Sequence, residues 1–185
     1  MTGSGAGRLL AFVGPSGVGK DSVMQALVAA RPDMGLVKRV ITRAADEVSE
    51  HSMPVDETTF EAMVAEGAFA LRWRAHGLAY GIPVSVDTDL AAGRTMLVNL
   101  SRAVLPEAQA RFGVLTVIHL TAPPAVLAVR LAGRGRENAS DIEKRLARAG
   151  DALPPGLRDV VQVSNTGPLE ETVRSVLERA QPERA

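Results

Sequence analysis

A glycine-rich segment that ends in lysine constrains this chain more than any other part of its sequence. The segment, residues 14–20, reads Gly-Pro-Ser-Gly-Val-Gly-Lys and follows the apolar run Leu9–Val13. Helical spacing of apolar residues begins directly after it and continues to about Ala30. This order of buried strand, glycine-rich turn and helix matches the G-x-x-x-x-G-K pattern, whose turn cradles phosphate groups.

The residue types in this segment explain why it predicts nucleotide binding. Glycines let backbone N–H groups face phosphate oxygens, and the helix N-terminus adds the positive end of its dipole. Lys20 supplies a cation for the β- and γ-phosphates, so we predict it to be catalytic. The predicted ATP-binding residues here are Gly14, Pro15, Ser16, Gly17, Val18, Gly19, Lys20, Asp21 and Ser22.

The position after the lysine departs from the pattern, which expects a serine or threonine whose hydroxyl binds Mg²⁺. Asp21 stands there instead, followed by Ser22. Carboxylates are good oxygen ligands for Mg²⁺, so Asp21 is a candidate ligand, directly or through water. The alternative is that Asp21 favours the helix N-terminus while Ser22 serves the metal. The candidate strand for a metal-binding acidic residue ends at Asn99 instead. A carboxylate at position 21 would therefore be more useful for holding the metal.

Composition excludes several other kinds of site. The 185 residues include no Cys and three widely spaced His, so neither disulfides nor thiolate chemistry nor a His-rich metal site is expected. Equal numbers of basic and acidic residues, 21 each, argue against general binding to nucleic acids or anionic membranes. No apolar stretch approaches the roughly 20 residues of a transmembrane helix, and no signal peptide is recognisable. We therefore expect a cytoplasmic protein.

Strands and helices alternate along most of the chain, which predicts an α/β fold with a mostly parallel sheet flanked by helices. Buried strands are expected at 9–13, 95–100, 115–120 and 160–163. Helices are expected at 20–30, 101–112, 123–131, 140–150 and 168–180.

The alternation breaks between residues 35 and 94. This stretch reads as a β-prone segment at 36–42, a helix capped by Asp56 that ends at Gly67, and a strand at 69–73. We predict one domain with an inserted substrate-binding subdomain and a helical lid. The predicted boundaries are 8–181 for the domain, 35–94 for the insertion, 130–148 for the lid region, and 1–7 and 182–185 for loose termini.

Several short segments, spread over nearly the whole chain, carry a family resemblance. They are Gly-Lys-Asp-Ser at 19–22, Ile-Thr-Arg at 41–43, His-Gly-Leu-Ala-Tyr-Gly at 76–81, Val-Asn-Leu-Ser-Arg at 98–102 and Arg-Gly-Arg-Glu-Asn-Ala-Ser at 134–140. The chain resembles guanylate kinases, and more closely a sister group, the ribose 1,5-bisphosphate phosphokinases of bacterial phosphonate catabolism. This resemblance implies transfer of the ATP γ-phosphoryl group to the 1-phosphate of ribose 1,5-bisphosphate, giving 5-phosphoribosyl 1-diphosphate, with ATP and Mg²⁺ as cofactors.

The resemblance also implies roles for residues outside the glycine-rich segment. Arg134 and Arg145 match positions in the lid that contact phosphates, and we predict them to be catalytic. Arg130 matches a further phosphate-contacting position, and Asn165 matches a position near the adenine. The alternative for these arginines is a solvated helix face that pairs with nearby acidic side chains.

A second group of residues, inside the insertion, is predicted to bind the acceptor. Arg43 and Tyr80 match acceptor-phosphate binders of the resembled family. Arg39, Arg72 and His76 complete the predicted group. Arg72 alternates with apolar neighbours on a predicted strand, so its face meets either the bisphosphate or water.

Two departures from guanylate kinases disfavour a guanine acceptor. Leu71 stands where that family reads guanine with a glutamate, and the family's aspartates are replaced in the stretch Asn99-Leu100-Ser101. A site without these acceptors loses selectivity for guanine. The expected partners are therefore ATP and a small phosphorylated ribose. A guanylate-type nucleoside monophosphate kinase and a non-catalytic guanylate-kinase-like binding module remain the alternatives, and the oligomeric state stays open, a homodimer included.

Overall fold

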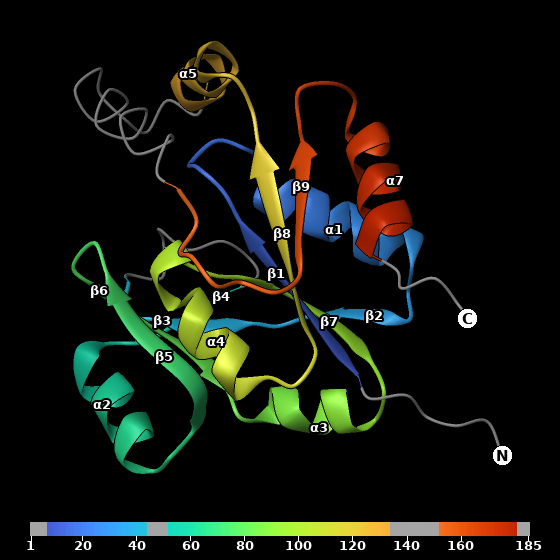
Figure 1. The fold of residues 1–185 in the computed structure, drawn as a ribbon. Coiled ribbons are helices and arrows are strands. Elements are labelled where there is room, and N and C mark those ends of the chain that lie inside the picture. The colour runs from blue at the N-terminus through green and yellow to red at the C-terminus, as the bar shows by residue number, and fades with distance from the viewer. Residues whose placement is uncertain (1–6, 44–51, 134–151, 181–185) are drawn as a thin grey trace, which may run out of the picture.

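The computed structural model describes residues 7–43, 52–133 and 152–180. Its larger sheet, here called the main sheet, has five parallel strands in the order β2-β7-β1-β8-β9 (Figure 1). These strands are β1 (Arg8–Val13), β2 (Met34–Leu36), β7 (Thr95–Asn99), β8 (Leu115–Thr121) and β9 (Val160–Ser164). The predicted α/β fold with a mostly parallel sheet is therefore confirmed.

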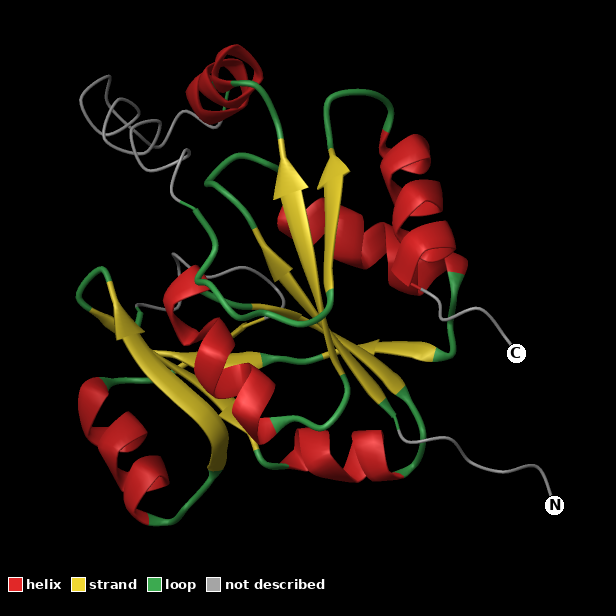
Figure 2. Ribbon diagram, in the orientation of Figure 1, coloured by secondary structure: helices red, strands yellow, loops and turns green. Residues whose placement is uncertain are grey.

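Helices cover both faces of the main sheet (Figure 2). They are α1 (Lys20–Ala30), α3 (Ser85–Ala91), the 3₁₀ turn η2 (Arg102–Val104), α4 (Leu105–Arg111) and α7 (Leu169–Ala180). Helix α5 (Pro124–Ala132) lies beyond the C-terminal end of β8 (Figure 1). Alternate residues of β1 enter opposite cores: Leu10 and Phe12 pack with α1 and α7, whereas Leu9 and Val13 pack with α4. This two-sided burial explains why β1 reads as an unbroken apolar run.

A second sheet, here called the side sheet, lies beside the main sheet and has the order β4-β3-β6-β5. Its elements are β3 (Arg39–Ile41), β4 (Ser52–Pro54), α2 (Glu57–Ala65), β5 (Phe69–Ala75) and β6 (Leu78–Pro83). Helix α2 packs on one face of this sheet. The predicted cap of that helix is confirmed, since the Asp56 carboxylate accepts a hydrogen bond from the Thr59 N–H at 2.6 Å.

Two local predictions differ from the structure, and three elements are not predicted. The β-prone segment 36–42 forms the end of β2 and the whole of β3, because the chain leaves the main sheet and enters the side sheet between them. The helix predicted at 101–112 is divided into η2 and α4, with Pro106 in the first turn of α4, where its missing N–H is tolerated. The three elements that are not predicted at all are strands β4 and β6 and helix α3.

The helix predicted at 140–150 lies outside the described residues. Within the described ranges, no helix combines the length and the apolar character needed to cross a bilayer.

Candidate active site

The glycine-rich turn, here called the P-loop, joins β1 to α1 at the edge of the main sheet where the parallel strands end. Three of its residues have positive φ angles: Gly14 at 151°, Gly17 at 82° and Gly19 at 92°. A Cβ atom on Gly14 would lie 2.4 Å from the Leu120 carbonyl oxygen of the neighbouring strand. The turn therefore needs glycine both for its backbone angles and for its close approach to β8.

Lys20 is the first residue of α1, and its side chain bends back over the P-loop. Its Nζ donates hydrogen bonds to the carbonyl oxygens of Gly14, at 2.9 Å, and Pro15, at 3.1 Å. The ammonium group is thus held at the mouth of the turn, beside the helix N-terminus. Both features place positive charge where a polyphosphate would be cradled.

Asp21 and Ser22 have different surroundings. The Asp21 side chain is partly buried, and its Oδ1 accepts a hydrogen bond from Asn99 Nδ2 at 3.4 Å, whereas Ser22 is exposed. Asn99 ends β7, which pairs directly with β1, so the contact joins the end of β7 to the first turn of α1 beside the P-loop. Asp21 is therefore better placed than Ser22 to hold a cation near the P-loop.

The oxygen donors near Asp21 fit Mg²⁺. Among the described residues, no three His, Asp or Glu side chains come together as a metal-binding group. Mg²⁺ is commonly bound through one or two carboxylates together with substrate phosphates and water. A single carboxylate next to a phosphate cradle is a donor set of this kind.

Three side chains stack on one face of the side sheet. The Trp73 and Tyr80 rings are parallel within 7°, with centroids 5.1 Å apart, and the Arg39 guanidinium lies 5.7 Å from the Tyr80 ring centroid. Burial lowers the pKa of Arg39, while the negative charge of Asp21 acts in the opposite direction. The predicted acceptor residues Arg39 and Tyr80 are therefore brought together.

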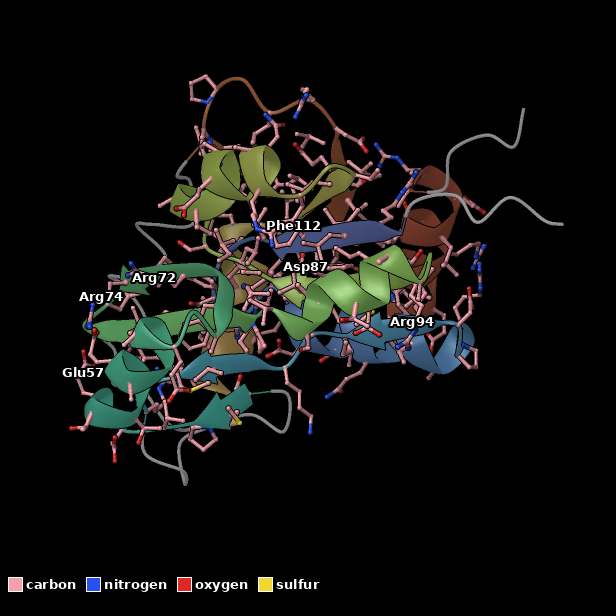
Figure 3. All side chains as sticks on the ribbon, turned by 90° about the horizontal axis from the view of Figure 1, so that it is seen from below. Glu57, Arg72, Arg74, Asp87, Arg94 and Phe112 are labelled. Carbon is pink, nitrogen blue, oxygen red and sulfur yellow. The ribbon has the colours of Figure 1, made fainter. Side chains whose placement is uncertain are left out.

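Arg72 lies on the opposite face of the side sheet. It pairs with Gly81, whereas Trp73 pairs with Tyr80, and successive residues of a strand point to opposite faces. Its neighbour on the same face, Arg74, forms ion pairs with Glu57 and Glu61 of α2, the latter at 2.7 Å (Figure 3). The structure therefore does not bring Arg72 together with Tyr80 and Arg39, and it leaves Arg72 exposed to water.

The other two predicted acceptor residues lie at one end of the side sheet. His76, with φ 54°, and Gly77, with φ 76°, form the two-residue turn between β5 and β6, so the turn requires left-handed backbone at both positions. Arg43 follows β3. An open depression of about 490 Å³ lies at this end of the side sheet, next to Arg43 and the turn. Its lining residues are Thr42, Arg43, Pro54, Val55, Asp56, Glu57 and Gly77.

Asn165 and Arg130 both contact the P-loop backbone. The Asn165 side chain is 5% exposed and donates from Nδ2 to the Val18 carbonyl oxygen at 2.7 Å. Arg130 Nη1 donates to the Asn165 carbonyl oxygen at 2.8 Å. Arg134 and Arg145, the predicted catalytic arginines of the lid, lie outside the described residues.

Sequence reasoning misses Trp73 and Thr172. Trp73 enters the stack only because β5 and β6 pair in one register, which the sequence does not reveal. Thr172 Oγ1 donates to Asn165 Oδ1 at 2.8 Å. One feature of the sequence could have pointed to Thr172: it lies on the apolar face of α7, beside Val173 and Val176. A hydroxyl buried on such a face needs a hydrogen-bond partner.

The chain is similar to proteins of known family over nearly its full length. A family model described as "AAA domain" matches residues 10–149. The protein named ribose 1,5-bisphosphate phosphokinase PhnN from Ruegeria sp. (strain TM1040) is 50% identical over 184 residues, which cover 100% of this chain and 97% of the relative. The protein of the same name from Pseudomonas fluorescens (strain SBW25) is 46% identical over 181 residues, which cover 93% of this chain and 94% of the relative.

Solved structures show the same fold at low sequence identity. A guanylate kinase from Anaplasma phagocytophilum superimposes with a TM-score of 0.64 and 18% identity, covering 95% of this chain and 88% of that one. A gluconokinase from Sinorhizobium meliloti 1021 gives a TM-score of 0.54 and 22% identity, covering 94% and 90%. With the P-loop geometry and the full-length identity taken together, this chain belongs to the ribose 1,5-bisphosphate phosphokinase family, on a guanylate-kinase-like P-loop fold.

Proposed function

We propose that this chain transfers the γ-phosphoryl group of Mg²⁺-bound ATP to the 1-phosphate of ribose 1,5-bisphosphate, giving 5-phosphoribosyl 1-diphosphate. The observation that carries the proposal is the Lys20 ammonium group held over the glycine-rich P-loop. A second cationic group, Arg39, is stacked on Tyr80 in the side sheet. The names of the full-length relatives support the same reaction.

The chemistry of the acceptor suits a site of this kind. A phosphate monoester has a second pKa of about 6, so it is largely ionised at neutral pH and needs no general base. The main obstacle is repulsion between two anionic phosphates, which positioned cations relieve. Lys20 would contact the donor phosphates, and Arg39, with the Tyr80 hydroxyl, would contact the acceptor. When bound, Mg²⁺ would neutralise charge on the donor phosphates, and the Asp21 carboxylate would hold it.

Leu71, which stands where guanylate kinases read guanine with a glutamate, offers no hydrogen bond to a base. Leu71 is 3% exposed and Ile82 is fully buried, and both pack into the core that α4 shares with the main sheet. Neither side chain can pair with the polar edge of a base. A guanylate-type reaction therefore has less support, because discrimination for a base depends on such hydrogen bonds.

A coupled assay of ADP release tests this proposal. We expect turnover with ATP and ribose 1,5-bisphosphate, much weaker or no turnover with GMP, and no turnover when Mg²⁺ is chelated. Faster turnover with GMP would instead establish a nucleoside monophosphate kinase. The absence of turnover with both acceptors, for protein that still binds ATP, would indicate a non-catalytic binding module.

The Arg39→Ala variant should weaken use of the acceptor. Loss of a guanidinium that contacts a phosphate should raise KM for ribose 1,5-bisphosphate about tenfold or more, because charge-assisted hydrogen bonds are worth about 1.5–3 kcal/mol. KM for ATP should change little. Arg74→Ala is the matched control, since Arg74 is an exposed arginine whose partners are on α2. Equal acceptor KM values for the two variants would exclude Arg39 from the acceptor site.

A further inference from the structure

A polar cluster in which two of the three residues are buried contacts one peptide group of the P-loop. We call it the Asn165 clamp, and it consists of Asn165, Thr172 and Arg130. The Val18 carbonyl oxygen accepts from Asn165 Nδ2 at 2.7 Å and from Arg130 Nη1 at 3.5 Å. The members come from three elements that are distant in sequence: the end of β9, helix α7 and helix α5.

Each end of the Asn165 side chain has a partner. Nδ2 donates to the Val18 carbonyl oxygen, and Oδ1 accepts from the Thr172 hydroxyl at 2.8 Å, with Thr172 only 3% exposed. The Asn165 backbone is also fixed, because its N–H donates to the Thr121 carbonyl oxygen at 2.8 Å. Turning the side chain toward a nucleotide base would remove the partner of the Thr172 hydroxyl and leave the Val18 oxygen with only the 3.5 Å contact from Arg130, which is costly in a buried site.

The geometry of the peptide bond gives this contact a consequence for phosphate binding. A trans peptide group is planar, and its C=O and N–H point in opposite directions. Holding the Val18 oxygen toward Asn165 therefore directs the Gly19 N–H away from Asn165, toward the other side of the turn. Gly19 itself must be a glycine for this approach, since its φ is 92° and a Cβ would lie 2.8 Å from Asn165 Nδ2.

We propose that Asn165 is a positioning residue that sets the orientation of the Val18–Gly19 peptide for binding the polyphosphate, and that it does not read the adenine. This inference rests on the proposed function, because it assumes that the P-loop binds ATP. It replaces the sequence-based expectation that the Asn165 side chain lies near the base. It also gives the buried hydroxyl of Thr172 a role, which is to orient the amide of Asn165.

Binding measurements with three ligands test the role of Asn165. Calorimetric titrations of wild type and Asn165→Ala would use ATP, GTP and inorganic tripolyphosphate, each with Mg²⁺. We expect the variant to bind all three more weakly by a similar factor, about tenfold or more, because a hydrogen bond to a charged group such as phosphate is worth about 1.5–3 kcal/mol and about 1.4 kcal/mol is tenfold in affinity. A loss confined to ATP, or no loss at all, would overturn the inference. A wild type that binds neither ATP nor tripolyphosphate would contradict the proposed function itself.

Variants of Thr172 keep the test decisive even if Asn165→Ala does not fold. Thr172→Val has nearly the same shape but lacks the donor to Asn165 Oδ1, whereas Thr172→Ser retains it. Thr172→Val should weaken binding of tripolyphosphate several-fold, and Thr172→Ser should bind it like wild type. Equal affinities for the Val and Ser variants would overturn the inference, because a role in packing alone does not depend on the hydroxyl.

Gln109→Ala is the matched control for lost stability. Gln109, like Asn165, is a side-chain amide with a partner at each end: its Nε2 donates to the Gly156 carbonyl oxygen at 3.0 Å, and its Oε1 accepts from the Arg158 N–H at 2.8 Å. These contacts lie near the start of β9, at the opposite end of the main sheet from the P-loop. Its removal should lower thermal stability without changing the affinity for tripolyphosphate. If Gln109→Ala lost a comparable amount of affinity, the weaker binding of Asn165→Ala would be explained by general destabilisation. That result would overturn the positioning role of Asn165.

Discussion

The Lys20→Ala variant is expected to lose phosphoryl transfer, with kcat lower by roughly a hundred- to a thousandfold, the usual cost of removing a preorganised charge-stabilising group. The reason lies in the place of the Lys20 ammonium group, which sits over the P-loop carbonyl oxygens of Gly14 and Pro15. Charge that builds up on the transferred phosphoryl group would develop next to it. The measurement is kcat in the coupled assay with ATP and ribose 1,5-bisphosphate.

A second lysine provides the control for this experiment. Lys38 is exposed and lies between β2 and β3, so Lys38→Ala removes the same charge from the protein without touching the P-loop. We expect Lys38→Ala to keep wild-type kcat, and both variants to keep wild-type thermal stability within a few degrees. If Lys20→Ala retained full activity, the assignment of the ATP site to the P-loop would be wrong.

The Gly14→Ala variant is expected to lose both stability and ATP binding. Its Cβ would meet the Leu120 carbonyl oxygen at 2.4 Å, and a main-chain atom of a central strand cannot move aside as a side chain can. The residue also has a φ of 151°, which L side chains rarely adopt. Together the clash and the strain should lower the free energy of unfolding by about 3 kcal/mol or more. Denaturant unfolding and an ATP titration would measure the two effects.

Two other glycines separate the clash from the strain. Gly67 has a positive φ of 70°, whereas the φ of Gly113 is not positive. A Cβ on either residue would meet nothing within 4 Å. Gly67→Ala should lose about 1 kcal/mol, the cost of left-handed backbone for an L residue. Gly113→Ala should stay within about 0.5 kcal/mol of wild type. A Gly14→Ala variant no less stable than Gly67→Ala would show that the contact with Leu120 is unimportant.

The main sheet and the P-loop could be predicted because their signals are local. Burial on both faces makes β1 continuously apolar, and positive φ angles at the turn require glycine, so both features can be read from consecutive residues. The cap of α2 by Asp56 is local in the same way. Each of these features is decided by neighbours within a few positions along the chain.

The side sheet could not be predicted as well, because its faces depend on pairing between distant strands. A register irregularity between Phe69 and Leu71 puts Phe69 on the α2 face, stacked on Phe60, while Leu71 faces the opposite core. Simple alternation along β5 would place both residues on one face. The pairing also puts Arg72 opposite Gly81, on the face that Tyr80 does not occupy.

The surroundings of Asn165 show the same limit at the P-loop. The sequence places Asn165 after the last strand, but its partners Val18 and Thr172 are 147 and 7 residues away along the chain. The proximity of Val18 follows from the order of strands in the main sheet, not from any local pattern. A role for the side chain therefore becomes visible only when the packing of α7 and β9 against the P-loop is known.

The burial of Leu71 and Ile82 against α4 has a consequence for attempts to re-engineer this enzyme. The proposed acceptor surface cannot be exchanged by itself, because the residues beneath it, Leu71 and Ile82, also belong to the core between the main sheet and α4. A graft of residues 39–83 from a relative with another acceptor would meet a mismatched α4 and leave voids or clashes beneath the new pocket. Exchange of acceptor preference should therefore succeed only when α4 is transplanted together with the strands it supports.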